Sequence, residues 1–314
     1  MERTKSARIV LPGGAGLVGQ NLVALLKEQG YSNLVVLDKH RTNLEILRRM
    51  HPEIVAEYAD LASHGEWEKR LSGAEAVVML QAQIGGNDVN QFERNNLDSS
   101  RRVLDAMKKN GVSYLVHISS SVVESVANDW YTNTKKAQER MAMDCGIPHV
   151  ILRPTLMFGW FDRKHLGWLS RFMRRAPVFP IPGHGRYMRQ PLYAGDFCNI
   201  ITSCIENRLT GAFNISGHEH VDYIDIIRQI RHAIGSRAVI LPIPYWLFHA
   251  LLAIWAVFDR NPPFTTQQLA ALVARDDFEV IDWPGIFGVT PTAFAEAIAL
   301  TYHDPVYSPI VLDF

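Results

Sequence analysis

The chain of 314 residues has ordinary globular composition, with 47% hydrophobic and 20% charged residues, and it is long enough for one large domain or two modest ones. Its 32 basic residues balance 32 acidic ones, which argues against nucleic acid or another polyanion as the main partner. The three cysteines (145, 198 and 204) are too few for a disulfide framework and lack metal-ligand spacing, and residues 1–7 lead into no secretory apolar core, so we expect a cytoplasmic protein.

Short apolar runs alternate with helical patterns through the first half of the chain. This alternation predicts an α/β fold of the Rossmann type, a doubly wound parallel sheet with helices on both faces and strands that are apolar on both sides. We expect strands at residues 9–11, 34–37, 54–59, 76–80, 114–118 and 149–152. We expect helices at residues 17–28, 44–50, 67–71, 91–110 (capped by Asp88 or Asn90) and 132–144.

The pattern changes after Pro154. Residues 159–189 are rich in Pro, Gly, Trp, Phe and Arg and predict loops around one helix, followed by a helix at 196–206 and a strand at 211–215. We therefore expect a Rossmann domain over residues 1–158, to which 190–215 returns, and a smaller mixed substrate domain over 159–314. The second domain should lie over the carboxyl ends of the strands, where such sheets bind ligands.

One segment of the second half, residues 239–258, carries no formal charge if His249 is neutral. Pro242 and Pro244 interrupt its first third and leave residues 245–258, which is 14 residues, for a helix. A bilayer span needs about 20 apolar residues. The segment therefore favours packing within the protein or a dimer, with weak association with a membrane surface as the alternative.

A glycine-rich turn between the first strand and the first helix predicts a dinucleotide site. In this pattern the first Gly permits a tight turn, the second lets the backbone approach a pyrophosphate, and the third lets the helix pack on the strand. The N-terminus of the helix then faces the phosphates with its positive end. The segment consists of Gly13, Gly14, Ala15, Gly16, Leu17, Val18 and Gly19.

Acidic residues after the second and third strands refine this prediction. Asp38 lies 19 residues beyond the last Gly, where a carboxylate binds the ribose 2′-hydroxyl and repels a 2′-phosphate, so we expect NAD rather than NADP. The basic residues Lys39 and Arg41 lie close by and could weaken the preference for NAD over NADP. Asp60, next to Leu61, is a candidate for the adenine amino group or a plain turn aspartate.

Tyr131 and Lys135 are four residues apart on an expected helix and therefore share a face. A nearby ammonium favours the phenolate, so Lys135 is expected to lower the pKa of Tyr131 and make it an acid/base, and also to touch the nicotinamide ribose. Serines 119–121 follow the fifth strand, where a hydroxyl is placed to hold a substrate oxygen. Together with the glycine-rich turn, these residues predict hydride transfer on an alcohol or ketone.

The chain resembles the extended short-chain dehydrogenase/reductases, the NAD-dependent epimerase/dehydratase group, over roughly residues 7–302. The resemblance implies that Ser121 is the catalytic hydroxyl, with Ser120 as the alternative, that Asn96 shapes the proton relay, and that Arg189 grips a nucleotide diphosphate. It also places Leu61 and Gln81 at the cofactor and implies a homodimer through helices 91–110 and 132–144. The matching segments are Gly13-x-x-Gly16-x-x-Gly19, Ala59-Asp60-Leu61, Asn95-Asn96-Leu97, Ser119-Ser120-Ser121, Tyr131-x-x-x-Lys135, Arg153-Pro154-Thr155 and residues 189–196.

The chain departs from that family at several positions. Pro12 stands where threonine or serine is usual, Val123-Glu124 replaces an aromatic-glycine pair, and only 10 residues separate Ser121 from Tyr131. The short segment is similar to atypical members such as the complex I accessory subunit, a likeness that residues 261–266 and 288–291 extend. Some of those relatives bind a nucleotide without known turnover, but this chain keeps serine, tyrosine and lysine together.

The resulting prediction is NAD-dependent epimerisation or ketoreduction at a secondary alcohol or ketone of a nucleotide-sugar. A reductase of a lipid-like substrate and a non-catalytic nucleotide-binding subunit remain as alternatives. We expect no metal site, because the histidines are scattered and His218-Glu219-His220 lacks a third ligand at helical spacing. The basic stretch at residues 171–175 is expected to be a solvated helix face.

Overall fold

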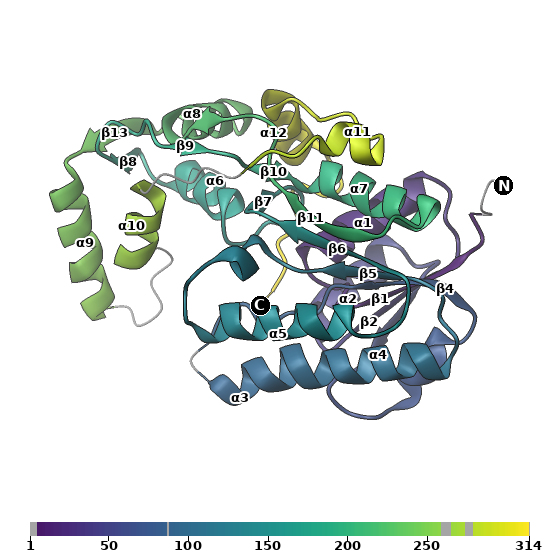
Figure 1. Ribbon diagram of the computed structural model, residues 1–314. Helices are drawn as coiled ribbons and strands as arrows, with labels where there is room; N and C mark the ends of the chain where they lie inside the picture. Colours follow the sequence, from purple (N-terminus) through teal and green to yellow (C-terminus); the bar gives the residue numbers. More distant parts are fainter. Residues whose placement is uncertain (1–4, 87, 259–264, 274–278, 314) are drawn as a thin grey trace.

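The computed structural model describes residues 5–86, 88–258, 265–273 and 279–313. A seven-stranded, wholly parallel sheet in the order β11-β6-β5-β4-β1-β2-β3 forms the centre of the molecule (Figure 1). The strands are β1 Arg8–Pro12, β2 Leu34–Asp38, β3 Val55–Tyr58, β4 Ala74–Met79, β5 Leu115–Ile118, β6 His149–Pro154 and β11 Gly211–Ile215. The Rossmann-type fold class is therefore confirmed.

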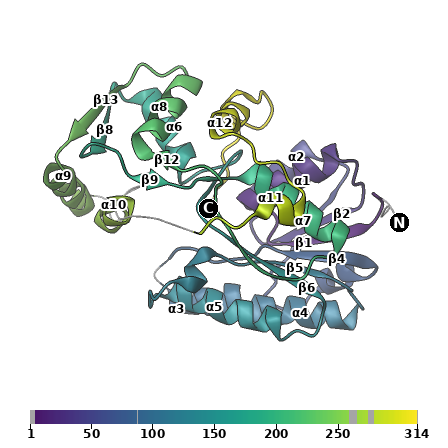
Figure 2. The same cartoon turned by 45° about the horizontal axis from the view of Figure 1, so that its top comes forward.

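Helices cover both faces of this sheet, as the alternation predicted (Figures 1 and 2). Side chains alternate along each strand, so the strands feed two apolar cores, of which one packs on α1, α2 and α7 and the other on η1, α4 and α5. The bounds are α1 Leu17–Glu28, α2 Arg41–Met50, α7 Ala194–Asn207, the 3₁₀ helix η1 Glu66–Leu71, α3 Val89–Phe92, the π-helix η2 Glu93–Asp98, α4 Ser99–Lys109 and α5 Trp130–Met143.

Two expectations about the first half need correction. Strand β3 is not apolar on both sides: Val55 and Tyr58 are about two-fifths exposed, because β3 is an edge strand of the sheet. The helix expected at 91–110 starts earlier, at Val89, and contains the π-helical segment η2. Asp88 is its cap and accepts a hydrogen bond from the backbone of Asn90.

The second half builds a separate apolar core from short strand pairs and helices. Residues 157–189 contain strands that the proline-rich sequence did not predict, because β8 forms only by pairing with β13, sixty residues later. The elements of this half are β7 Met157–Phe158, α6 Leu166–Arg175, β8 Val178–Pro182, β9 Met188–Arg189, β10 Leu192–Tyr193, β12 Val221–Asp222, α8 Tyr223–Ala233, β13 Val239–Ile243, α9 Tyr245–Phe258, α10 Thr266–Val273, α11 Trp283–Phe287 and α12 Phe294–His303. The 3₁₀ helix η3 Ser121–Glu124 lies earlier, between β5 and α5.

The chain returns to the Rossmann region near its end. Phe287 of α11 accepts a hydrogen bond from Ser203 of α7, and Thr292 donates to Asp196 at the start of the same helix. The division into domains at residue 158 stays a prediction. The likeness at residues 261–266 falls partly outside the described residues, because 261–264 are not described.

Candidate active site

A cavity of about 840 Å³ opens at the carboxyl ends of the central strands and brings most of the predicted site residues together. Such sheets bind ligands at this edge, between strands where the order reverses, which here is between β1 and β4. Gly14, Asn96 and Arg189 are not among the residues that line it. The predicted residues that do line it are Gly13, Ala15, Gly16, Leu17, Val18, Gly19, Asp38, Asp60, Leu61, Gln81, Ser120, Ser121, Tyr131 and Lys135.

The glycine-rich turn is shaped by close backbone contacts. Gly13 has a φ of +76°, and a Cβ there would lie 2.3 Å from the backbone nitrogen of Gln81. A Cβ on Gly19 would lie 2.3 Å from the carbonyl oxygen of Gly14. No side chain caps the helix that starts after Gly16, so its first amides are available to a ligand. Only glycine fits these positions, and the resulting cradle fits a pyrophosphate.

Asp38 lies at the end of β2 and faces the same turn. One carboxylate oxygen accepts a hydrogen bond of 3.0 Å from the amide of Ala15, and the other accepts one of 2.9 Å from the amide of His40. Burial raises the pKa of Asp38, and these amides partly oppose that rise. A carboxylate has about four acceptor positions, so two remain for the ribose hydroxyls of a dinucleotide.

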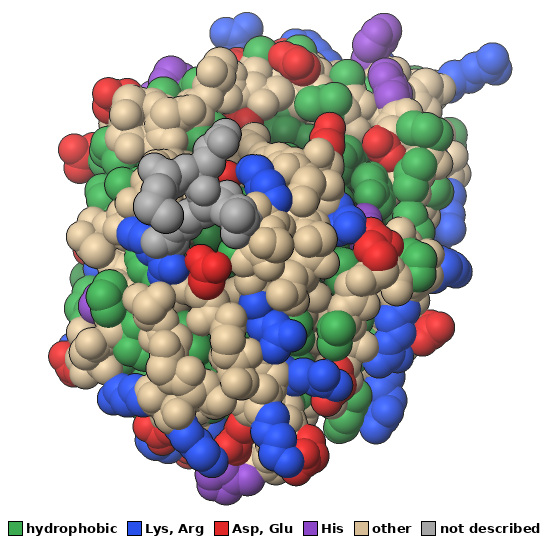
Figure 3. All heavy atoms as spheres, turned by 90° about the vertical axis from the view of Figure 1, so that its right-hand side faces the viewer, with side chains coloured by type: hydrophobic (Ala, Val, Ile, Leu, Met, Phe, Trp, Pro, Cys, Tyr) green, Lys and Arg blue, Asp and Glu red, His purple; other side chains and the backbone are tan. Residues whose placement is uncertain are grey.

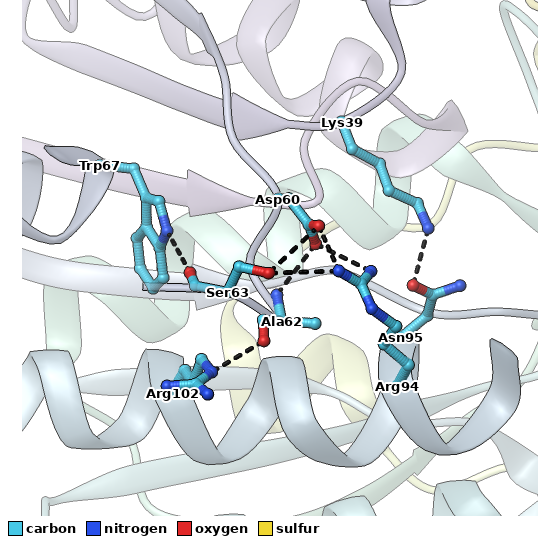
Figure 4. A network of polar contacts seen from close by, with 8 residues as sticks. All are labelled: Lys39, Asp60, Ala62, Ser63, Trp67, Arg94, Asn95 and Arg102. Carbon is cyan, nitrogen blue, oxygen red and sulfur yellow. Dashed lines mark hydrogen bonds and ion pairs between the residues drawn. The ribbon is translucent and has the colours of Figure 1, made fainter. Parts of the chain in front are cut away.

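Asp60 lines the cavity and belongs to a polar network (Figure 4). Arg94 of η2 contacts both of its carboxylate oxygens, and this hydrogen bonding lowers the pKa of Asp60. Lys39 donates a hydrogen bond of 2.7 Å to Asn95. Arg94 was missed by sequence reasoning because it lies 34 residues from Asp60. The role of Asp60 at an adenine stays a prediction.

Tyr131 is the second residue of α5 and hydrogen-bonds Ser120. Ser120, which the resemblance implied only as the alternative to Ser121, is thus the serine that contacts the phenol of Tyr131. Ser121 lines the same cavity at the start of η3. Burial raises the pKa of Tyr131, the charge of Asp129 raises it further, and the Ser120 contact lowers it. The prediction that Lys135 gives Tyr131 a low pKa is therefore wrong for this arrangement. Burial is the largest effect on the phenol, and it raises the pKa of Tyr131.

Lys135 lies one turn further along α5 and is 1% exposed. Its amine donates hydrogen bonds of 2.9 Å to the carbonyl of Ile118 and 2.6 Å to the side chain of Gln138. Burial lowers the pKa of Lys135 to about 7, although Glu139 opposes this shift. The side chain therefore changes its charge near neutral pH.

A buried chain of hydrogen bonds connects Lys135 to the neighbouring strand and helix. Gln138 donates to the hydroxyl of Ser100 at 2.8 Å and to the carbonyl of Gln81 at 3.2 Å. Gln81 is the residue against which Gly13 packs. Gln138 was not among the predicted site residues, although its spacing of three from Lys135 places both on one helix face.

Asn96 is fully buried in η2 and hydrogen-bonds the backbone of the loop that follows β4. Its side-chain oxygen accepts a 2.6 Å hydrogen bond from the amide of Gln83, and its amide group donates to the carbonyl of Gln83 and to the hydroxyl of Thr134. Asn96 therefore holds Gln83, which lines the cavity, against α5. Its role in a proton relay stays a prediction.

Arg189 lies in β9 and does not contribute to the cavity lining. Its guanidinium donates a hydrogen bond of 3.0 Å to the carbonyl of Met188, and its charge acts on the buried Tyr223. The structure thus does not bring this predicted diphosphate ligand to the other site residues. Arg163 and Lys164, which the sequence analysis did not select, do line the cavity.

Metal ligands do not gather anywhere in the part of the chain that the structure describes. Glu219, within the His218-Glu219-His220 segment, accepts a hydrogen bond of 2.8 Å from the backbone of Phe294. This carboxylate therefore caps the start of α12, a structural task.

Comparison with known proteins relates the chain to one family and to several enzymes. A profile described as the NAD dependent epimerase/dehydratase family matches residues 9–216. The chain is 23% identical over 259 residues to a ceramide reductase of Caulobacter vibrioides, covering 81% of this chain and 80% of that protein. It is 23% identical over 310 residues to the human sterol-4-alpha-carboxylate 3-dehydrogenase, decarboxylating, covering 86% and 80%.

Solved structures share the fold at low identity. UDP-glucuronic acid 4-epimerase from Bacillus cereus, in complex with NAD, superposes with a TM-score of 0.71 at 20% identity, covering 94% of this chain and 97% of that one. UDP-N-acetylglucosamine 4-epimerase from Methanobrevibacter ruminantium M1 gives a TM-score of 0.73 at 16% identity, covering 96% and 98%.

Proposed function

The chain belongs to the NAD dependent epimerase/dehydratase family, and we propose that it acts at a secondary alcohol or ketone with Tyr131 as the acid/base. The observation that carries this proposal is one cavity lined by both the glycine-rich turn and the Tyr131–Ser120 pair. The cofactor end fits NAD, because a Cβ at Gly13 would fill the cradle and Asp38 keeps acceptors for ribose hydroxyls. Bound NAD accepts or supplies the hydride.

Tyr131 exchanges a proton with the substrate oxygen in this mechanism. Its raised pKa keeps the phenol protonated at neutral pH, so it is poised to donate a proton to a ketone oxygen during reduction. In the opposite direction Tyr131 can act only after it has lost its own proton, and the phenolate oxygen then takes the proton of a substrate hydroxyl. Ser120 positions the phenol, and the lysine behind it, with a pKa of about 7, adjusts the local charge as it titrates.

A nucleotide-sugar is the first candidate substrate. Support comes from the sugar-nucleotide epimerases among the structural neighbours and from a GDP-L-fucose synthase of Arabidopsis thaliana among the relatives. Arg163 and Lys164 on the cavity wall offer positive charge for its phosphates. An epimerase of this kind would oxidise the sugar, let the keto form turn over, and reduce its other face.

A lipid-like substrate is the second candidate, and specific features favour it. Arg189 lies outside the cavity lining, and the lining includes the apolar residues Val122, Leu156, Met157 and Phe161. Two relatives are named for ceramide and sterol substrates. Such a substrate would bind mainly by burial of apolar surface.

The test begins with the nucleotide that co-purifies with the protein, identified by mass. The holo-protein is then incubated with UDP-, dTDP- and GDP-sugars without added cofactor, and with a long-chain keto lipid and a 3-ketosteroid plus NADH. A new sugar isomer would identify an epimerase, and NADH consumption with a keto lipid would identify a lipid reductase. Retained NAD with no turnover on any substrate would support a non-catalytic subunit and contradict the proposal.

Variants at the site assign the roles. Tyr131→Phe removes only the proton donor, so it should retain NAD and lose at least about a hundredfold in kcat. Ser120→Ala and Ser121→Ala form a matched pair, and we expect the larger loss of kcat in Ser120→Ala because that serine bonds the phenol. Equal rates for Tyr131→Phe and the parent would overturn the mechanism.

A further inference from the structure

Helix α9 exposes an unusual amount of apolar surface. None of its 14 residues is acidic or is Lys or Arg, and Leu252 is its one buried side chain. Besides Tyr245 (39% exposed), which lies near Leu252 on the helix, six large apolar side chains remain open to solvent. They are Trp246 (70% exposed), Leu251, Ile254, Trp255, Val257 (79%) and Phe258 (86%).

These six side chains occupy one half of the helix. At about 100° per residue they span an arc of about 180°, from Trp246 and Val257 at one edge to Trp255 at the other. Leu252 falls outside this arc, on the side that packs on the protein, where α9 contacts β8 and α10. Helix α9 lies at the periphery, away from the central sheet (Figures 1 and 2).

The exposed surface continues from α9 into the strand pair β8–β13. Val239 and Leu241 lie two residues apart and therefore on one face, and Val178 is paired with Val239. All three are at least two-fifths exposed. Helix α6, just before β8, ends in the exposed Arg174 and Arg175. The combined surface, here called the α9 patch, is thus apolar with a cationic border.

The size of the α9 patch sets it apart from an ordinary soluble surface. At roughly 200 Å² for each aromatic side chain, the exposed parts of Trp246, Trp255 and Phe258 alone amount to roughly 400 Å². Six aliphatic side chains add to this area, whereas the largest patch on a typical monomer is roughly 300–600 Å². The opposite side of the molecule carries interspersed charges of both signs (Figure 3).

The chemistry of the α9 patch matches a bilayer surface better than a protein. Protein interfaces carry about one hydrogen bond per 100–200 Å², but the exposed arc of α9 offers only two indole groups for hydrogen bonding. Indole rings favour the membrane–water interface, and basic residues beside them favour anionic headgroups. At about 21 Å the helix is too short to cross the bilayer core of about 30 Å, and no described helix is long and apolar enough to do so.

We propose that the protein docks reversibly on anionic lipid bilayers through the α9 patch, with α9 lying in the plane of the interface. Figures 1 and 2 place α9 on the same side of the molecule as the first turns of α3 and α5. Trp130, the first residue of α5, is exposed. This inference stands whether or not the proposed reaction is correct.

Flotation of the full chain with vesicles tests the proposal. The vesicles are pure phosphatidylcholine or a 3:1 mixture with phosphatidylserine, and the variants are Ile254→Asp/Phe258→Asp and Arg174→Gln/Arg175→Gln. We expect the parent to float with the mixed vesicles, the first variant to lose at least about tenfold in partitioning, and the second to lose its preference for the anionic mixture. Val55→Asp, a similarly exposed apolar site on β3, should bind as the parent does.

Thermal melting confirms that each variant is folded, and sedimentation velocity measures its oligomeric state. Failure of the folded parent to float with either vesicle would overturn the proposal, as would equal flotation of the parent and Ile254→Asp/Phe258→Asp. A dimer that this substitution dissociates, without vesicle binding, would assign the α9 patch to a second copy of the chain and also overturn it.

Discussion

Replacing Lys135 with methionine removes an ionisable group that burial keeps from being fully charged at neutral pH. The pKa of Lys135 is lowered from its ordinary 10.5 to about 7, because the ammonium has lost its solvent. Methionine is of similar length and carries no charge, so the effect of titration is removed with little change in packing. The carbonyl of Ile118 and the side chain of Gln138 each lose one hydrogen bond.

The sign of the pH effect follows from the direction of this shift. Between about pH 7 and 10.5 the unfolded chain binds the Lys135 proton and the folded chain does not, so the free energy of unfolding rises with pH. One proton corresponds to about 1.4 kcal/mol per pH unit. From pH 7.5 to 9, where the folded group is mostly neutral, Lys135 should therefore add about 2 kcal/mol to the stability of the parent relative to Lys135→Met.

Urea denaturation of both proteins at pH 7.5, 8.25 and 9 measures this difference. Subtracting the curves removes the contributions of groups that both proteins share, including the thiol of Cys204, whose pKa burial raises to about 12. Lys136→Met, at the next position of α5, controls for the loss of a lysine from this helix. A parent–variant difference that changes by less than about 0.5 kcal/mol across the range would refute the argument from burial.

Three further predictions concern the cofactor turn and the buried charges. Gly13→Ala should cost more than 2 kcal/mol and abolish NAD retention, because its Cβ meets backbone atoms, whereas Gly30→Ala, also at positive φ but in open space, should cost about 1 kcal/mol by urea denaturation. Asp38→Asn should lower the ratio of NADP to NAD dissociation constants at least about tenfold in titration calorimetry, because the charge that repels a 2′-phosphate is lost; an unchanged ratio would contradict this assignment. Glu139→Leu should lower the free energy of unfolding by about 3 kcal/mol, because it removes the buried partner of Arg153. Glu124→Leu, which removes an exposed partner of the same guanidinium, should lower it by less than about 1 kcal/mol. Equal losses of stability in urea denaturation would argue against a buried pair.

Local patterns predicted the fold well in the Rossmann region. The residues 17–28 and 211–215 were expected as a helix and a strand and are α1 and β11. Apolar periodicity and capping residues act within a few positions, so they are readable without tertiary contacts. β8 was missed because its ladder partner, β13, is remote in sequence and its own prolines argue against a strand.

The same distinction between local sequence patterns and long-range contacts applies to the candidate site. The glycine-rich turn and the spacing of Tyr131 and Lys135 follow from local geometry, and the structure places all of these residues on one cavity except Gly14. The contacts of Asp60 with Arg94, and of Gln138 with Ser100, join elements far apart in sequence. The position of Arg189 outside the cavity depends likewise on how the second half of the chain packs.

The sequence by itself determined the alternation of strands and helices in the Rossmann region, the dinucleotide turn and the helix face that presents Tyr131 and Lys135. Only the tertiary structure decided how these two groups ionise, which serine meets the phenol, and how much of α9 stays exposed. The physical reason is that local geometry depends on neighbouring residues along the chain. Desolvation depends on everything that packs around a group, so spacing placed an ammonium near a phenol but burial decided the pKa of each.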